Sequence, residues 1–258
     1  MELESTKRIE EILSKYIDNL RSINNNSPKL IVVLGVLGDL DSFEYVQTLL
    51  SSIDLLKTYN IKLKIIGIGN SKGKELFCKF TKIEPDCIEL VHTDELHQSL
   101  NLNNGLSITK YKLLNLILMC TGFKSPGTLK EVLRGYTGDP FRRAIFQQEE
   151  EIRICDHISF KGKFFNLAGP KSQLRPFELA TRRLLNMKEV LTHWSSYMPY
   201  SNYFTSRGGT FLFKNDQLVY CYRPSSLLLS IPNPRNPLEF LNSLDISEIS
   251  VSQNELEI

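Results

Sequence analysis

Polar residues follow one apolar run at the point where a strand would turn into a helix. The run LIVVLGVL (30–37) is followed by Asp39, Asp41 and Ser42, and an amphipathic stretch then extends over 42–60. The N-terminus of a helix presents free backbone N–H groups and the positive end of the helix dipole. Such a junction can lower the pKa of a thiol, line a small ligand site, or be closed by a capping carboxylate.

Two interpretations of this turn are compatible with its residues. Asp41 followed three residues later by Glu44 has the spacing of a capping box, with Asp41 as the N-cap. The alternative is a small polar ligand site formed by Asp39, Asp41, Ser42 and Arg207 at the end of a sheet, where open α/β sheets usually bind ligands.

Arg207 also has two interpretations. It stands directly before GGTFLF, so it can belong to a turn whose glycines supply unusual backbone angles ahead of a strand. It can instead be an anchoring arginine that faces the first turn. An ion pair between Arg207 and Asp39 or Asp41 would make the site structural.

The cysteines and histidines do not form a recognisable motif. The five cysteines are scattered, odd in number and without a CxxC pair, which predicts reduced thiols. Cys78 and Cys120 are the candidate redox residues, although free cysteines are commonly buried. No histidine and cysteine have zinc-like spacing, so we expect neither a metal site nor a cofactor.

Charge and hydropathy exclude several classes of partner. The formal net charge of +2 gives no electrostatic case for nucleic acid. No apolar run approaches the roughly 20 residues of a membrane span, and the charged N-terminus lacks an apolar signal core. We therefore expect a protein that is not integral to a membrane and lies in the cytoplasm, or in the plastid stroma if eukaryotic.

Periodicity predicts alternating helices and strands in the first part of the chain. This order favours a parallel or mixed sheet covered by helices. The predicted helices are 6–24, 42–60, 72–81 and 94–102, and the predicted strands are 30–37, 62–69 and 87–92.

The rest of the chain predicts a helical insertion followed by a β-hairpin. Residues 103–200 show few strand signals, and LLNLILMC (113–120) is typical of a buried element. Asn215-Asp216 marks a hairpin within 208–224, and a short helix closes the domain near 237–243. The predicted domains are an N-terminal helix (1–28), a main domain (29–243) and an acidic tail (244–258). A helix over 175–194 carries an apolar stripe of Leu179, Leu184, Met187, Leu191 and Trp194.

Four segments resemble a known family. At LGDLDSFEY, SPGTLKEVLRGYTGD, RPFELATRRLLNMKEVL and RGGTFLF, the chain resembles a peroxiredoxin-like (AhpC/TSA-type) thioredoxin-fold family of cyanobacteria and plant plastids. The resemblance spans about 30–240. It implies an α/β fold, in which a thioredoxin-like central mixed sheet is flanked by helices and a largely helical insertion precedes the C-terminal β-hairpin.

The resemblance also implies where a reactive thiol would lie. Peroxiredoxins carry P-x-x-x-[TS]-x-x-C at the first turn, and these positions fall here on Gly35, Asp39 and Ser42. A thioredoxin CxxC would fall on Ser42 and Tyr45, whereas the active-site arginine has a counterpart in Arg207. A serine hydroxyl cannot form the sulfenic acid and disulfide that peroxide reduction requires. We therefore expect ordinary peroxiredoxin activity to be absent at this turn.

Three functional hypotheses remain. The first is a non-catalytic binding or assembly factor that docks on another protein, in photosynthetic cells as the family's distribution implies. The second is a thiol-dependent antioxidant oxidoreductase that uses a cysteine at another position, such as Cys78 or Cys120. The third is a small-molecule site at Asp39, Ser42 and Arg207.

Overall fold

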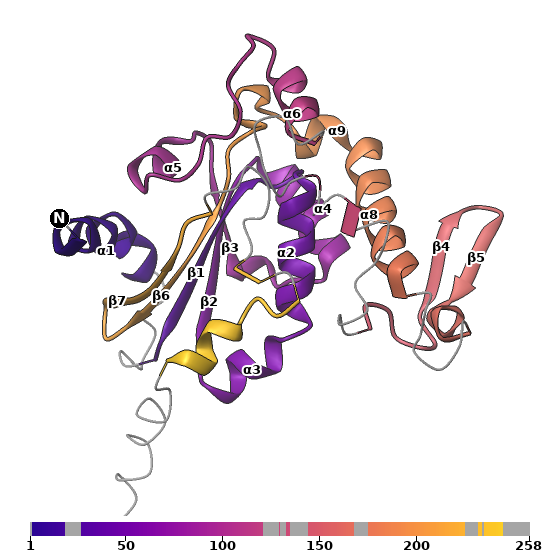
Figure 1. Cartoon of the computed structure of the whole chain (residues 1–258), viewed down its shortest axis with the longest axis horizontal. Coiled ribbons are helices and arrows are strands. Elements are labelled where there is room, and N and C mark those ends of the chain that lie inside the picture. The colour runs from indigo at the N-terminus through magenta and orange to yellow at the C-terminus, as the bar shows by residue number, and fades with distance from the viewer. Residues whose placement is uncertain are drawn as a thin grey trace, which may run out of the picture.

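A computed structural model describes residues 2–18, 27–120, 129, 133–134, 144–167, 175–224, 232–233 and 235–244. Its centre is a five-stranded sheet in the order β3-β2-β1-β6-β7 (Figure 1). Strands β1, β2 and β3 are parallel, whereas β6 is antiparallel to both β1 and β7. This mixed sheet flanked by helices is a thioredoxin-like architecture and confirms the predicted fold class. The strands are β1 (Lys29–Val36), β2 (Lys62–Ile68), β3 (Ile88–Val91), β6 (Gly209–Lys214) and β7 (Gln217–Tyr222).

Strand β1 is buried along its whole length because helices cover both faces of the sheet. One face packs against α2 (Leu40–Leu50) and α4 (Ser71–Thr81), and the other packs against α1 (Glu2–Asp18) and α5 (Glu95–Ser99). Alternate residues of β1 enter the two cores, which explains the continuous apolar run in the sequence. Leu30, Val32 and Leu34 enter the first core, and Ile31 and Val33 enter the second.

The helix predicted over 42–60 is two helices. Helix α2 ends at Leu50, and α3 (Ile53–Thr58) begins after Ser51 and Ser52. The Ser51 hydroxyl donates a hydrogen bond to the Thr48 carbonyl at 2.6 Å. Serine competes for backbone groups in this way and so disfavours a helix interior, a local effect that the apolar periodicity does not report.

The β6–β7 hairpin forms where it was predicted and is tied to β1. Asn215 and Asp216 both have positive φ (51° and 62°), as a two-residue type I′ turn requires. The ammonium of Lys29, at the start of β1, donates to Oδ1 of Asp216 at 2.7 Å. The Lys29 side chain is buried, so this ion pair satisfies its charge.

The insertion contains a second sheet that the sequence analysis missed. Strands β4 (Glu151–Cys155) and β5 (Ile158–Lys161) form an antiparallel hairpin. Phe146, Ile152 and Phe165 form a small core of their own beneath it. The other elements bounded in the described part of this region are α6 (Lys112–Cys120), η2 (Gly162–Asn166), α8 (Arg175–Thr192) and α9 (Trp194–Tyr197), and η3 (Ser201–Tyr203) follows them.

One prediction about burial in the insertion is wrong, and the apolar stripe of a second helix is only partly buried. Helix α6 was predicted to be buried, yet Leu113, Leu114 and Ile117 are exposed. The predicted apolar stripe of α8 divides: Leu179 is buried, whereas the other members of the stripe are exposed. The exposed members are Leu184, Met187, Leu191 and Trp194.

The short connecting and terminal elements complete the chain. The segment near 237–243 is a 3₁₀ helix, η4 (Glu239–Ser243), and η1 (Pro85–Cys87) precedes β3. Helix α1 starts at Glu2, earlier than predicted. The predicted end of this helix beyond 18 and nearly all of the acidic tail (244–258) lie outside the described residues.

Substitution of Phe43 tests the packing of the first core. Its ring is fully buried and contacts the rings of Phe77, Phe80 and Tyr197. We expect Phe43→Ala to lower the free energy of unfolding by about 3–5 kcal/mol, because it removes apolar contacts and leaves a cavity. Urea denaturation measures this change. Phe164→Ala, at a half-exposed ring, should cost less than half as much, and equal costs would contradict this packing.

Candidate functional site

The turn after β1 is capped by Asp39, not by Asp41. Helix α2 begins at Leu40, and Oδ1 of Asp39 accepts a hydrogen bond from the Asp41 backbone N–H at 3.4 Å. Asp39 has the extended backbone angles of an N-cap, φ −70° and ψ 135°. The predicted capping box of Asp41 and Glu44 is therefore wrong, because the N-cap lies two residues earlier. The Glu44 carboxylate instead binds Arg134 and Arg183.

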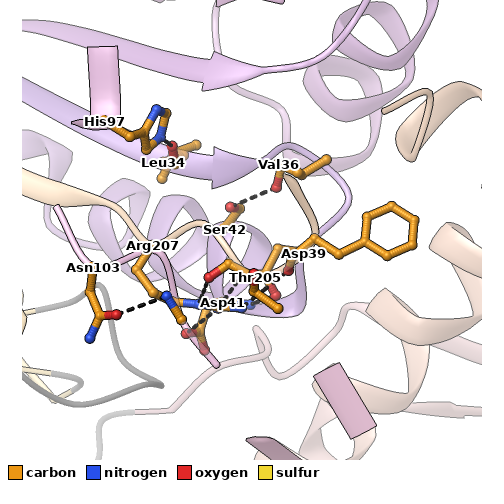
Figure 2. A network of polar contacts seen from close by, with 11 residues as sticks. Leu34, Val36, Asp39, Asp41, Ser42, His97, Asn103, Thr205 and Arg207 are labelled. Atoms are coloured by element: carbon orange, nitrogen blue, oxygen red, sulfur yellow. Dashed lines mark hydrogen bonds and ion pairs between the residues drawn. The ribbon is translucent and has the colours of Figure 1, made fainter. Parts of the chain in front are cut away.

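The guanidinium of Arg207 lies against this cap (Figure 2). Its Nη1 donates to Oδ2 of Asp39 at 2.6 Å and to Oδ2 of Asp41 at 3.5 Å. Its Nε and Nη2 donate to the carbonyl oxygens of Thr205 and Phe204 at 3.1 and 3.3 Å. Arg207 is 0% exposed, so it is a buried cation whose three nitrogens all have partners.

Close backbone packing places Arg207 at the turn. A Cβ on Gly208 would lie 1.9 Å from the Val33 carbonyl oxygen, and one on Gly35 would lie 2.3 Å from the Ser206 carbonyl oxygen. The loop before β6 can therefore press against the end of β1 only because these two positions lack side chains. The Arg207 N–H also donates to the Asn103 carbonyl at 2.8 Å, so the start of the insertion joins the site (Figure 2).

Ser42 and Tyr45 point into the protein. Ser42 is 2% exposed, and its hydroxyl donates to the Val36 carbonyl at 3.0 Å. The Tyr45 hydroxyl forms a hydrogen bond with Oγ1 of Thr210 on β6. Burial strongly raises the pKa of Tyr45, which keeps the phenol protonated. Neither side chain offers a nucleophile to solvent.

The structure brings three of the five predicted turn residues, Asp39, Asp41 and Arg207, together as one polar cluster. Ser42 and Tyr45 make separate hydrogen bonds. Asp39 and Asp41 supply two carboxylates, and the Arg207 guanidinium forms an ion pair with each of them. Within the described part of the chain, no group of three or more histidine, cysteine or acidic side chains could hold a metal ion. As it stands, the cluster can fix a strand, a helix and a loop to one another.

The candidate cysteines lie away from this cluster. Cys78 is buried in α4 within the first core, and burial raises the pKa of its thiol. Burial also raises the pKa of the Cys87 and Cys221 thiols. A raised pKa reduces the thiolate fraction on which redox reactivity depends. Cys120 belongs to the end of α6, and its side chain lies outside the described residues.

A second polar cluster, which the sequence analysis missed, joins α2 to the insertion. The Glu44 carboxylate is buried and accepts from Arg134 at 3.2 Å and from Nε of Arg183 at 3.0 Å. One turn further along, the side-chain amides of Gln47 and Asn186 exchange two hydrogen bonds, at 2.9 and 3.0 Å. A polar pocket opens beside this cluster, lined in part by Glu44, Gln47 and Arg182.

Some of these contacts carry a sequence signal and others do not. Arg207 and Asp39 are charged residues beside predicted strand ends, so their pairing could be anticipated. The carbonyl oxygens of Thr205 and Phe204 cannot be inferred from residue type. The burial of His97 also has no clear signal in the sequence, because charged and polar residues flank it. Its ring is buried, with Nε2 2.7 Å from the Leu34 carbonyl oxygen (Figure 2).

Asp39 should be more important for stability than Asp41. We expect Asp39→Ala to lower the free energy of unfolding by about 3–5 kcal/mol. The substitution removes the ion-pair partner at 2.6 Å from the buried Arg207 cation and also removes the N-cap of α2. Asp41→Ala, whose carboxylate is 3.5 Å from Nη1, should cost less than about 1 kcal/mol. Chemical denaturation of both variants tests this order, which equal losses would contradict.

Comparison with known proteins identifies the family. The sequence profile described as AhpC/TSA antioxidant enzyme matches residues 48–226, which include Arg207 and the insertion but begin beyond the Asp39–Tyr45 turn. Neither the comparison with curated proteins nor the comparison with solved structures found a match. The profile covers more than half of the chain, and the sheet has the architecture that the resemblance implied. The chain belongs to the AhpC/TSA antioxidant enzyme family.

Proposed function

We propose that this family member lacks a peroxidatic cysteine and is a non-catalytic binding or assembly factor. The observation that carries the proposal is the closed turn: Ser42 occupies the aligned cysteine position and is buried, and Arg207 is paired with Asp39. A peroxidatic site needs a thiolate that peroxide can reach, and Ser42 supplies neither the thiol nor the access.

The ion pair between Arg207 and Asp39 supports this proposal, because the Asp39 carboxylate neutralises the charge of the arginine. In the family's catalytic pattern, the arginine stabilises a thiolate and the leaving oxygen of the peroxide. Here the Asp39 carboxylate lies 2.6 Å from Nη1 of Arg207, so Asp39 is the anion that pairs with this arginine in place of a thiolate. Asp39 and Asp41 would also raise the pKa of any nucleophile placed beside them. The polar residues therefore hold the fold, and the hypothesis of a small-molecule site here loses support.

The distribution of exposed apolar side chains supports protein binding. Among the described residues, every exposed large hydrophobic side chain other than Leu40 and Val219 lies between Ile108 and Trp194. That interval falls within the insertion that we assign to 103–200. Soluble monomers rarely expose extended apolar patches, and such patches mark interaction sites. We assign the docking surface to α6 within this insertion, with another protein as its partner.

The cellular setting of the proposal follows from the resemblance. We place the protein in photosynthetic cells, in the cytoplasm or the plastid stroma, with neither nucleic acid nor a cofactor as its partner. Among the described residues, no helix combines the length and the apolar character that crossing a membrane requires.

The second candidate function is a thiol-dependent oxidoreductase that uses Cys78 or Cys120. The description of the family as antioxidant enzymes favours it. The burial and the raised pKa of Cys78 oppose it. The two candidates differ in one measurable property, which is thiol-dependent peroxide consumption.

Peroxide consumption with a thioredoxin reductant separates these candidates. We expect the reduced wild-type protein and a variant with all five cysteines changed to serine to give the same background rate, because no thiolate is presented at the turn. Stopped-flow measurement of peroxide loss checks this. Thiol-dependent turnover that Cys78→Ser or Cys120→Ser abolishes would overturn the proposal.

Capture from native lysate tests the docking surface. We expect the tagged wild-type protein to retain a partner in stoichiometric amount, and Leu113→Glu/Ile117→Glu on α6 to lose it, because charge on an apolar contact surface opposes docking. Quantitative mass spectrometry measures both. A charge change at the exposed Val219, outside the insertion, is the matched control. Equal recovery of the partner by the α6 variant would contradict the assignment of the surface.

A further inference from the structure

Helix α8 buries polar residues beside Leu179 and Val190 and leaves a second apolar stripe exposed. The side that faces α2 and the loop at 145–146 buries polar residues: Glu178 and Asn186 are each 1% exposed. The opposite side exposes Leu184 (43%) and Leu191 (60%). An isolated surface helix places its apolar stripe toward the core. The exposed stripe that includes Leu184 and Leu191 therefore does not belong to any core cluster of the described residues.

Polar contacts fix the orientation of α8. The Glu178 carboxylate accepts from the backbone N–H groups of Ile145 and Phe146 at 2.8 and 2.9 Å. Asn186 forms its double amide pair with Gln47 of α2. Rotating the helix to bury its apolar side would expose Leu179 and Val190 and break these buried hydrogen bonds. The apolar side thus remains outward when the protein is alone.

The spacing on the outward side is that of a coiled-coil seam. The positions alternate in steps of three and four residues, as the a and d positions of heptads do. From Phe177 to Leu191 they extend about 21 Å along the helix. Trp194, the first residue of α9, is exposed and follows three residues later. We call this set the α8 seam: Phe177, Ala180, Leu184, Met187, Leu191 and Trp194.

We propose that the α8 seam binds the same seam of a second copy of this chain, with the two helices antiparallel about a two-fold axis. The alternation of three and four is symmetric about a point between Leu184 and Met187. An antiparallel pair therefore places Leu184 against Met187 of the second copy, and the small Ala180 against Leu191. Each contact occurs twice, as a two-fold interface requires. In Figure 1, α8 lies on the side of the sheet away from α1, between the helices that cover the sheet and the β4–β5 hairpin.

The charges beside the seam favour the antiparallel arrangement. In a parallel pair, residues five apart face each other across the seam, so Arg183 would approach Lys188 of the second copy. Arg183 is bound to Glu44, and Lys188 donates to the Ile154 carbonyl, so neither side chain can easily turn away. In an antiparallel pair, Lys188 instead approaches the hydroxyl of Thr181. That pairing brings no like charges together.

This self-association goes beyond the proposed function. The docking of another protein is tested on α6, whereas the second copy occupies α8. The dimer requires neither a particular answer on peroxide chemistry nor an identified cellular partner. A dimer without a captured partner would count against the proposed function alone, and a monomer with a captured partner would count against the dimer alone.

Sedimentation velocity on the full chain over a range of concentrations tests the dimer. We expect the wild-type protein to be a dimer, and Leu184→Glu/Leu191→Glu to weaken association by at least about ten-fold, because both changes place carboxylates in the seam. Leu113→Glu/Ile117→Glu on α6 is the matched control and should remain dimeric. Circular dichroism and thermal melting show that each variant is folded. A monomeric wild-type protein, or a seam variant that remains dimeric, overturns the proposal.

Thr181→Glu tests the orientation. In the antiparallel pair, each new carboxylate lies beside Lys188 of the other copy, so association should tighten and this gain should shrink at high salt. In a parallel pair, the carboxylate would not face Lys188, and no salt-dependent gain would follow. Unchanged or weaker association of Thr181→Glu therefore overturns the antiparallel arrangement.

Discussion

The buried ion pair between Arg207 and Asp39 is the interaction on which the first turn of this protein depends. Arg207 comes from the loop before β6, and Asp39 caps α2 directly after β1, so one contact joins the β1–α2 turn to a loop that is distant in the chain. A buried guanidinium is costly unless its donors are satisfied. The carbonyl oxygens of Thr205 and Phe204 complete that satisfaction. The strand, the helix and the loop therefore keep one arrangement.

Under the function that we propose, this constraint explains how a member of an antioxidant enzyme family can keep the strand–turn–helix arrangement of a redox site without its reactivity. The helix N-terminus is occupied by its own carboxylate, and the arginine is neutralised by the same group. Ser42 closes the turn with a hydrogen bond to β1. The function that we propose has moved to the insertion, where exposed apolar side chains are concentrated, and the sheet serves to position that surface.

The sequence predicts the sheet well because its signals are local. Apolar runs define β1 and β2, and Asn215-Asp216 defines the hairpin. The same sequence predicts the members of the polar cluster, because charged residues flank the ends of strands. It does not predict that Asp39 rather than Asp41 caps α2, since both residues suit an N-cap. It also leaves the orientation of α8 open, because periodicity identifies an apolar stripe but cannot say which side faces the core. That orientation depends on Glu178 and Asn186, whose partners lie far away in the chain.

A double-mutant cycle between Asp39 and Arg207 tests the central claim most directly. Asp39→Ala, Arg207→Met and the double variant would be compared with the wild type by the free energy of unfolding. If the ion pair holds the turn, the double variant should be more stable than the sum of the two single losses predicts, by about 2 kcal/mol or more. Additive losses would contradict the account, because the two residues would then act independently and Arg207 would be available for another role.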